Sequence, residues 1–494
     1  MSNFVDVASS RVLPTQPYDT LADYVSAGGG KGLDAARAVS SETIIEELAA
    51  SGLRGRGGAG FPTGVKWRTI KSFASPLLQT SVVVNAAEGE PGTFKDRAII
   101  RANPYAVIEG ALIAARAMDA RSVVIASKAS FAAELGRLRA AIAEVRAAGW
   151  LGDVDVTVVE GPSEYLYGEE TALLEVIDGR PPFPRIAPPF RRGIVEVVAS
   201  QEDAESGSGL PANVQMAGTE NDSDAPPVLV NNVETMANVA AIIAKGAAWF
   251  RSIGTTDSPG TIVCTITGAV QHPGVFEVPM GTRLADVIDR AGGLVPERAL
   301  RAVLVGVSNA VLTPDKIETE LSYEAMAAVG SGLGSAGFIV LADDVDPVSV
   351  AAGVSRFLAI ESCGQCTPCK QDGAEIARRL TAAANGDAAA EDLTAINERL
   401  GTVADGARCS LASQQQAVIG SLLAAFDQEI TSRFAPGVTS VPVHLVAQLV
   451  DIDEQGATID PTFADKQPDW TYDDVDSGKT PVERFTDHRA AVEG

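Results

Sequence analysis

Cysteine and histidine are scarce in this sequence of 494 residues, and long apolar runs are absent. It has five cysteines and three histidines, and His272, His444 and His488 are too scattered for a histidine-rich metal site. No apolar run reaches the roughly 20 residues that a membrane-spanning helix needs. Residues 1–15 lack the charged start and apolar core of a signal peptide. These absences predict a cytoplasmic protein without direct membrane insertion.

Positive charge is also in short supply. The chain has 39 Lys and Arg residues against 64 Asp and Glu residues, a formal net charge of −25. So acidic a surface argues against binding to nucleic acid or to an anionic membrane, although a local pocket can still hold an anionic nucleotide. Two acidic segments stand out. Residues 199–227 are predicted to form a surface insertion or disordered loop, and the tail 451–494 is predicted to be extended or disordered.

Four of the five cysteines form one pattern. Cys363, Cys366 and Cys369 have CxxCxxC spacing, and Cys409 follows forty residues later. Three thiolates at this spacing can converge on one centre from a turn, and the distant fourth closes the ligand shell. The pattern favours a [4Fe–4S] cluster. A structural zinc site is the alternative, although all-cysteine zinc sites usually come as two CxxC pairs. Cys264 is predicted to be a buried apolar residue.

Strand-like and helix-like segments alternate in the first half of the chain, after a start (1–50) that is predicted to be peripheral. The strands are expected at 81–85, 122–127 and 154–159, and the helices at 43–50, 105–118 and 129–148. Such alternation predicts an α/β region with a parallel sheet. Further along, residues 260–345 are typical of a small α+β unit. Residues 348–435 have a helical pattern and predict a small bundle that carries the four cysteines.

A glycine-rich segment, Gly55–Gly60, matches the GxGxxG pattern. The match is weak by itself, because residues 332–337 match it too. A Rossmann fingerprint needs a strand before the glycines and a helix after them, whereas here a helix precedes and Phe61-Pro62 follows. Glycines nevertheless let backbone N–H groups approach a phosphate, and Arg54, Arg56 and Lys66 add positive charge. The residues alone leave nucleotide binding and a simple tight turn both open.

Three more polar clusters lie at 85–97, 165–171 and 231–235. The first two come after predicted strands, and open α/β sheets bind ligands at the carboxyl ends of their strands. Each cluster alone can be a solvated turn. Four clusters in one region favour a ligand site.

Five motifs together identify a family. The chain resembles the NADH-binding flavoprotein subunit of respiratory complex I and the diaphorase subunits of soluble NAD-linked hydrogenases and formate dehydrogenases. The motifs are GLRGRGGAGFPTGVKW (52–67), NAAEGEPGTFKDR (85–97), YGEETALLEVIDGRPPFPR (167–185), VNNVET (230–235) and ESCGQCTPC (361–369) with Cys409. They occur in the family's order.

The resemblance implies four regions. They are a Rossmann-like α/β domain for FMN and NADH (1–259, with the acidic insertion 199–227), a ubiquitin-like SLBB α+β module (260–345), a helical [4Fe–4S] domain (346–436) and an acidic C-terminal extension (437–494).

The resemblance also implies the site residues. Expected to bind FMN or NADH are Gly55, Arg56, Gly57, Gly58, Gly60, Phe61, Lys66, Asn85, Glu88, Gly168, Glu169, Glu170, Asn231, Asn232 and Thr235. Among these, Phe61 and Glu170 are expected in the NADH pocket. Glu90 and Tyr165 are expected beside the nicotinamide as the catalytic-site residues. The cluster ligands are expected to be Cys363, Cys366, Cys369 and Cys409.

The implied activity is that of an NADH dehydrogenase of the diaphorase type. Hydride passes between NADH and FMN, and single electrons pass to the cluster, because a flavin can do both kinds of transfer. The family usually works with a thioredoxin-like [2Fe–2S] protein. No cysteine precedes Cys264, so that protein is expected as a separate partner subunit of a larger redox complex of the complex I, hydrogenase or formate dehydrogenase type.

Three departures from the family leave an alternative open. The usual Asn-Ala-Asp-Glu reads Asn85-Ala-Ala87-Glu88, and Arg68 and Thr69 stand where some members have a stacking aromatic. The stretch between residues 188 and 231 is also longer than the family's linker. NADPH could therefore replace NADH. The alternative function is a non-catalytic electron-wiring subunit that keeps the cluster but has lost nucleotide or flavin binding.

Overall fold

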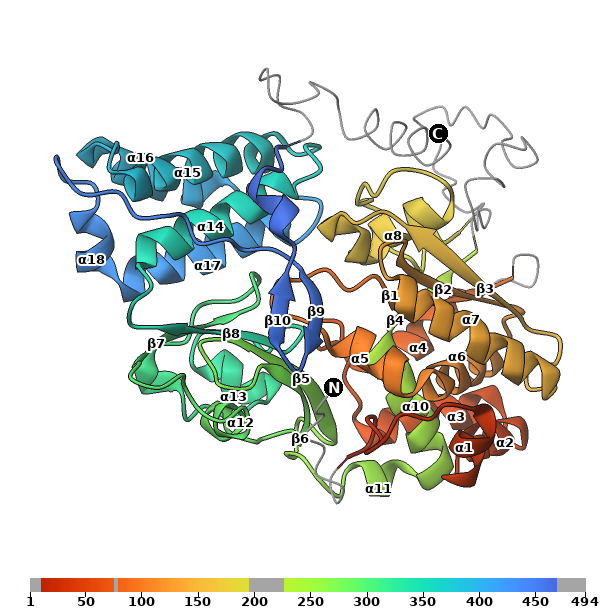
Figure 1. Cartoon of the computed structure of the whole chain (residues 1–494). Helices are drawn as coiled ribbons and strands as arrows, with labels where there is room; N and C mark the ends of the chain where they lie inside the picture. The colour runs from red at the N-terminus through yellow and green to blue at the C-terminus, as the bar shows by residue number, and fades with distance from the viewer. Residues whose placement is uncertain (1–9, 75–78, 195–225, 469–494) are drawn as a thin grey trace, which may run out of the picture.

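The computed structural model describes residues 10–74, 79–194 and 226–468. Figure 1 shows an α/β region on the right, a region with a mixed sheet at the lower left, and a helical region at the upper left. The predicted fold class is confirmed, because each of these architectures was expected in this order. The predicted acidic insertion lies outside the described residues, except for Pro226 and Pro227.

The α/β region is built on a four-stranded parallel sheet in the order β3-β2-β1-β4. The strands are β1 (Ser81–Ala86), β2 (Ser122–Lys128), β3 (Asp155–Gly161) and β4 (Val228–Asn232). Helices cover both faces, so the strands consist of near-continuous apolar runs, and Val82, Val83 and Val84 are fully buried. Each of the three expected strands is one residue longer in the structure, and β4 completes the sheet.

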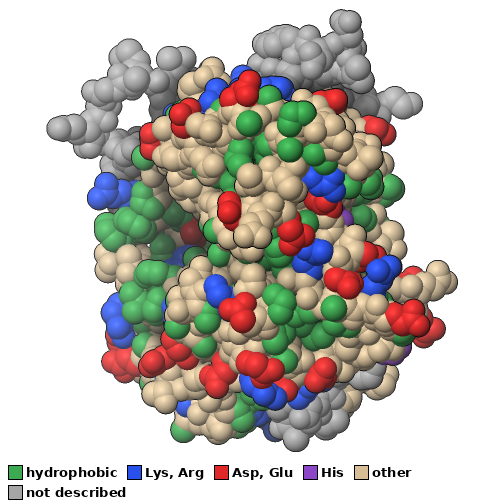
Figure 2. All heavy atoms as spheres, turned by 90° about the vertical axis from the view of Figure 1, so that its left-hand side faces the viewer, with side chains coloured by type: hydrophobic (Ala, Val, Ile, Leu, Met, Phe, Trp, Pro, Cys, Tyr) green, Lys and Arg blue, Asp and Glu red, His purple; other side chains and the backbone are tan. Residues whose placement is uncertain are grey.

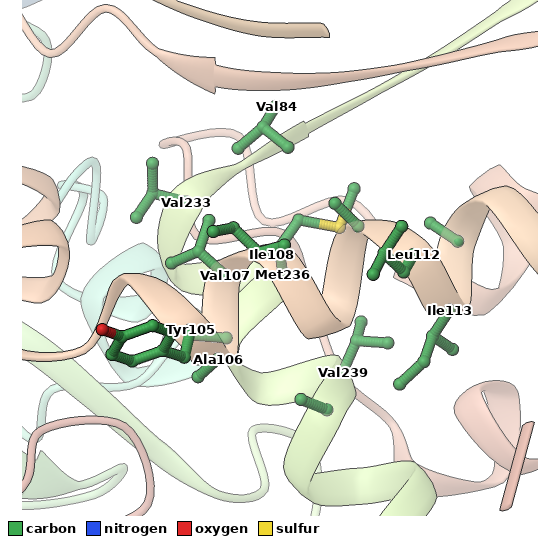
Figure 3. Close-up of a cluster of buried hydrophobic side chains, with 14 of the residues drawn as sticks. Val84, Tyr105, Ala106, Val107, Ile108, Leu112, Ile113, Val233, Met236 and Val239 are labelled. Atoms are coloured by element: carbon green, nitrogen blue, oxygen red, sulfur yellow. The ribbon is translucent and has the colours of Figure 1, made fainter. Parts of the chain in front are cut away.

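The helices of this region are α1 (Leu21–Ser26), α2 (Lys31–Arg37), α3 (Ser41–Ser51), α4 (Thr63–Ser72), α5 (Lys95–Ala102), α6 (Pro104–Met118), α7 (Ala132–Ala147), η1 (Tyr165–Gly168), α8 (Glu170–Ile177), α10 (Val233–Lys245) and α11 (Ala247–Phe250). Figure 3 shows Ile108 and Leu112 of α6 packed with Met236 and Val239 of α10. A Cβ at Gly110 would lie 1.9 Å from the carbonyl oxygen of Met236, so glycine is needed for this close contact.

A helix that crosses a membrane must be both long and apolar. Within the described ranges, no single helix is long and apolar enough to cross a membrane. The pair α5 and α6 reaches the required length and apolar character only when taken together, across a bend of 98°.

Residues 10–50 are integrated into the core, so the prediction of a peripheral segment is wrong for them. Val12 and Leu13 are buried, and the buried carboxylate of Glu277 accepts hydrogen bonds from their backbone nitrogens at 3.0 and 2.7 Å. The buried Glu109 accepts a hydrogen bond from the hydroxyl of Tyr24 at 2.7 Å. These two buried carboxylates connect residues near the start of the chain to elements far along the sequence.

The mixed-sheet region contains β5 (Thr261–Gly268), β6 (Gly274–Pro279), α12 (Leu284–Arg290), β7 (Leu300–Val305), η2 (Pro314–Lys316), α13 (Tyr323–Ala328) and β8 (Gly337–Ala342). Its sheet has the order β6-β5-β8-β7, with β5 and β8 parallel and the other two pairs antiparallel. Cys264 is fully buried in β5, as predicted.

The helical region contains α14 (Pro347–Ile360), α15 (Thr367–Asn385), α16 (Ala390–Thr402), α17 (Leu411–Ala425) and α18 (Asp427–Ser432). The predicted bundle is confirmed. Figure 2 shows the side of the molecule that lies at the left in Figure 1. On this face, acidic and basic side chains are interspersed with hydrophobic ones, so neither sign forms a large patch.

Residues 437–468, which we call the C-terminal strap, run back from the helical region to the α/β region. They include β9 (Leu449–Asp453), β10 (Gly456–Ile459) and η3 (Pro461–Ala464). Arg97 of α5 donates to the carbonyl oxygen of Leu449 at 2.7 Å, and Arg356 of α14 donates to that of Phe463 at 2.9 Å. The prediction of an extended or disordered tail is therefore wrong for residues 451–468, and residues 469–494 lie outside the described residues.

Lys128, at the end of β2, contacts the strap from inside the protein. Its fully buried ammonium donates to the carbonyl oxygen of Ser163 at 3.0 Å and to Oε1 of Gln448 at 2.8 Å. Both acceptors are neutral, and burial lowers the pKa of Lys128 to about 7.

This pKa predicts a pH-dependent stability. Because the pKa of Lys128 is lower in the folded chain than its usual 10.5, the unfolded chain binds more protons between those values, and stability from this group rises with pH above about 7. Relative to a Lys128→Met variant, the wild type is expected to gain up to about 1.4 kcal/mol per pH unit. Urea midpoints at pH 7, 8 and 9 measure the gain. The control is Lys71→Met, which removes a partly exposed lysine paired with Asp119. A constant difference between wild type and Lys128→Met at all three pH values would contradict this expectation.

Candidate functional site

The carboxyl ends of β1 and β4 mark the point where the strand order of the parallel sheet reverses. From β1 the chain builds outward through β2 to β3, and β4 then pairs with the other side of β1. Such a switch point leaves a crevice outside the strand ends, where open α/β sheets bind ligands. Asn85 lies near the end of one strand and Asn232 ends the other, and the two are paired in register. The polar clusters predicted at 85–97 and 231–235 therefore meet at one place.

The 85–97 loop is held by hydrogen bonds of its own. The Asn85 side chain donates to the carbonyl oxygen of Gly168 at 2.8 Å and accepts from the backbone nitrogen of Ala87 at 3.1 Å. The buried carboxylate of Glu88 accepts from Nε of Arg97 at 2.9 Å. The loop is thus fixed at its beginning by an amide and in its middle by an ion pair.

A buried ion-pair network lies where this loop meets α10. Nζ of Lys95 is 2.7 Å from Oδ1 of Asp96, 3.0 Å from Oε2 of Glu234 and 3.2 Å from Oδ1 of Asn232. Burial by itself lowers the pKa of Lys95, but the carboxylates of Asp96 and Glu234 raise it on balance. Sequence reasoning missed Lys95, Asp96 and Glu234 as site residues. They stand inside the quoted motifs, but nothing in a polar motif tells which charges are buried.

The glycine loop crosses the start of α10. The backbone nitrogen of Arg56 donates to Oγ1 of Thr235 at 2.9 Å, and a Cβ at Gly57 would lie 3.4 Å from the Cβ of Asn232. The buried guanidinium of Arg56 donates to the carbonyl oxygen of Thr261 in the mixed-sheet region at 3.0 Å. Gly60 has φ +63°, and a Cβ there would meet the ring of Tyr323 at 2.3 Å. Glycine is required at this turn because both the backbone angle and the space exclude a side chain.

Helix α4 and helix α8 are joined at the edge of the same site. Lys66 of α4 forms an ion pair with Glu170 of α8, and both side chains are partly exposed. Next to Lys66, the buried Nε1 of Trp67 donates to Oδ1 of Asn231 at 2.8 Å. Glu169 serves mainly as the N-cap of α8, since its carboxylate accepts from the backbone nitrogens of the helix's first turn. Lys66 is thus a partly exposed cation at the edge of the site.

The two residues expected to be catalytic lie deeper, where the regions meet. The carboxylate of Glu90 accepts from the backbone nitrogen of Val307 at 3.2 Å and from the hydroxyl of Ser335. Burial raises the pKa of Glu90. Tyr165 packs edge-on against Phe357 of α14, with ring centroids 5.5 Å apart. Burial also raises the pKa of Tyr165, and the nearby Glu90 raises it further. In this structure Glu90 faces the mixed-sheet region and Tyr165 faces the helical region.

The residues around the switch point fit an FMN molecule. The backbone of Gly57 and Gly58 offers donors with no side chain in the way, and a Cβ at Gly58 would have its nearest neighbour at 3.9 Å. Lys66 could supply a cation for a phosphate, and the amides of Asn85 and Asn232 could supply partners for hydroxyl groups and ring edges. Phe61, with 53% of its surface exposed, presents a free ring at the rim.

The four predicted cysteines surround one cavity. Cys363, Cys366, Cys369 and Cys409 all line it. The same cavity is lined by Leu166 and Pro184 of the α/β region and by Ser362, Arg408 and Leu411 of the helical region. Leu166, Pro184 and Arg408 were not anticipated, because cavity walls come from segments with no common sequence pattern.

The donor set at this cavity fits a [4Fe–4S] cluster. Its four thiols line one place, and each iron of such a cluster takes one thiolate. Burial raises the pKa of the Cys409 thiol to about 12, and a bound metal cation would favour the thiolate form.

Comparisons with known proteins agree with this geometry. Residues 48–241 match the Nuo51 FMN-binding domain, residues 263–306 match the SLBB domain, and residues 349–433 match the NADH-ubiquinone oxidoreductase-F iron-sulfur binding region. An NADH-quinone oxidoreductase F protein of Rhizobium meliloti is 36% identical over 74% of this chain and 81% of its own length. The NADP-reducing hydrogenase protein HndC of Solidesulfovibrio fructosivorans is 33% identical over 90% of this chain and 85% of its own length.

A solved structure shows the same arrangement. The crystal structure of an NAD+-reducing [NiFe]-hydrogenase in the H2-reduced state aligns with a TM-score of 0.72 and 30% identity, over 86% of this chain and 68% of that chain. The resemblance inferred from the five motifs is confirmed. The chain belongs to the family of NADH-quinone oxidoreductase F proteins, and it carries that family's FMN-binding domain, SLBB domain and 4Fe–4S-binding region.

Proposed function

We propose that this chain is the NADH dehydrogenase subunit of a larger redox complex. It takes a hydride from NADH at the switch-point site and passes single electrons to the cysteine cavity. The bound FMN supplies the conversion between two-electron and one-electron chemistry. All other tasks fall to the protein, which binds the nucleotide, orients it, and keeps the two redox groups close together.

One observation carries this proposal. A single helical turn, η1, belongs to both sites at once. Leu166 in its middle lines the cysteine cavity, and two residues later the carbonyl oxygen of Gly168 accepts the hydrogen bond from Asn85 at the other site. A Cβ at Gly168 would lie 3.0 Å from the carbonyl oxygen of Ala87, so the turn and the 85–97 loop touch backbone to backbone. Electrons that arrive at one site have a short path to the other.

The placement of the side chains supports a binding role for each predicted residue. Gly55, Gly57, Gly58 and Gly60 shape the loop, and Lys66 neutralises the phosphate. Asn85, Asn231, Asn232 and Thr235 fix the flavin's surroundings, with Glu88, Glu169 and Arg56 holding the loops in place. Phe61 and Glu170 form the rim where the nicotinamide nucleotide enters. Glu90 and Tyr165 stand at the inner end, where the three regions meet.

The first test is anaerobic titration of the purified chain with NADH, followed by the visible flavin absorbance. We expect NADH to bleach the flavin band, and NADPH to do so only at higher concentration. Phe61→Ala is expected to raise the NADH concentration for half-bleaching about tenfold, because ring stacking contributes up to about 1.5 kcal/mol. Flavin content should stay unchanged, since Phe61 is exposed.

Phe73→Ala is the matched control for this titration. It removes another exposed phenylalanine, at the end of α4, whose ring packs on Phe190. A bound flavin that stays oxidised with both nucleotides would refute the proposal and support the electron-wiring alternative. The main observation in favour of that alternative is Ala87, which stands where the family usually has an aspartate.

The cluster ligands have a separate test. Cys409→Ser is expected to remove most of the bound iron and the electron paramagnetic resonance signal of the reduced cluster, because one iron loses its thiolate. Cys264→Ala is the matched control, since its sulfur is buried in β5 and lies 3.4 Å from the carbonyl oxygen of Phe276, away from the cavity. Equal iron loss in both variants would mean that the effect is general instability rather than lost ligation.

We also propose a separate iron–sulfur partner subunit, of the thioredoxin-like [2Fe–2S] kind. Within these 494 residues, four cysteines line the cavity and the fifth is buried in β5. None of the five is left to ligate a second cluster, which supports electron transfer from the cavity to another protein. Relatives named as subunits of NADH-quinone oxidoreductase and of a hydrogenase support this proposal.

Affinity purification of the tagged chain from its own host tests the partner. We expect a second iron–sulfur polypeptide in stoichiometric amount, released by high salt or mild denaturant together with most of the activity towards the native acceptor. A chain that purifies alone and reduces that acceptor at the full rate would overturn the proposal.

A further inference from the structure

Two of the four cysteine sulfurs accept hydrogen bonds from neighbouring side chains. Nε2 of Gln365 is 3.4 Å from Sγ of Cys363, and Oγ of Ser362 is 3.2 Å from Sγ of Cys369. The Ser362 hydroxyl accepts from the backbone nitrogen of Gly364 at 3.3 Å, which leaves its own proton for the sulfur. A thiolate ligand has no proton to give, so both contacts run from the side chain to the sulfur.

The Gln365 amide is held in this orientation from outside. Nη1 of Arg408 donates to Oε1 of Gln365 at 2.9 Å. A guanidinium can only donate, so it fixes the amide oxygen on its own side and turns the NH2 group towards Cys363. The same NH2 group is 3.4 Å from the carbonyl oxygen of Pro184, which also lines the cavity. Arg408 and Pro184 thus hold the donor from two sides.

A donor on a ligand sulfur affects the two redox states of a cluster differently. The reduced cluster carries one more negative charge, part of which lies on its sulfurs, so a hydrogen bond there stabilises the reduced state more than the oxidised one. Hydrogen bonds to sulfur are among the factors that set cluster potentials. The positive charge of Arg408 at the cavity wall acts in the same direction.

We propose that Gln365, oriented by Arg408, is a positioning residue that raises the reduction potential of the cluster through Cys363. This inference rests on the proposed function, because it needs a cluster on the four cysteines. A higher potential makes electron transfer from the flavin site to the cavity more favourable and transfer back less so. Ser362 is the second donor, on Cys369.

The test is a redox titration of the full chain, in which electron paramagnetic resonance measures the fraction of reduced cluster. Gln365→Leu keeps the approximate size of the side chain but removes the donor, and we expect the midpoint potential to shift to lower values. Arg408→Met frees the amide and removes a charge without touching Gln365, and we expect a shift in the same direction. Gln371→Leu, which replaces an exposed glutamine on the neighbouring helix α15, is expected to leave the midpoint unchanged.

The outcomes separate this inference from the proposed function. Iron content is measured on every variant, so that a lost cluster is not mistaken for a shifted one. An unchanged midpoint in Gln365→Leu with full iron content overturns the inference and leaves the proposed function intact. If Gln365→Leu loses iron, the midpoint potential of Arg408→Met tests the inference instead. An unchanged midpoint potential in that variant also overturns the inference. A wild-type chain with no cluster signal overturns the proposed function itself.

Discussion

The buried carboxylate of Glu234 holds the ligand loops of this protein in register. It lies on the first turn of α10, 3.0 Å from Nζ of Lys95 and 3.7 Å from Nε of Arg56, and it accepts from the backbone nitrogen of Val263 at 2.9 Å. These partners come from the 85–97 loop, the glycine loop and the mixed-sheet region. Removing one charge from such a buried ion-pair network leaves the remaining charges unpaired, and this typically costs about 3–5 kcal/mol of folding stability. The shape of the switch-point site therefore depends on a charge that need not touch any ligand.

The connection between the two redox sites depends on contacts just as local. Helical turn η1 presents Leu166 to the cysteine cavity and Gly168 to the flavin loop. The buried Glu361, two residues before the first cluster cysteine, accepts from the backbone nitrogen of Tyr165 at 2.7 Å and pairs with Lys466 of the strap at 2.6 Å. The strap thus stabilises the connection between the two sites, and it also contacts helix α5. Both sites are built into one frame, which suits electron transfer because the distance between the redox groups must stay fixed.

Sequence patterns succeeded where burial follows a period and failed where it depends on isolated contacts. The strands near residues 81, 122 and 155 were found because valine-rich runs bounded by turns fit a buried strand. Residues 451–468 of the strap were misread because their composition is acidic and polar. The strap is held instead by its backbone carbonyls, which accept from Arg97 and Arg356, and every sequence has such carbonyls. Lys95 and Glu234 were missed for a related reason, since a charge looks the same in sequence whether it is buried or solvated.

The sequence by itself determined the chemistry of this protein. It determined which thiolates can ligate iron, which glycines leave backbone donors free, and the order of the motifs that identifies the family. Only the tertiary structure decided which of these groups meet: that Asn85 and Asn232 pair on neighbouring strands, that four cysteines line one cavity, and that Gln365 turns its amide to a sulfur. The reason is physical. Ligand type depends on side-chain atoms that the sequence names, whereas distance and orientation depend on packing between segments up to hundreds of residues apart.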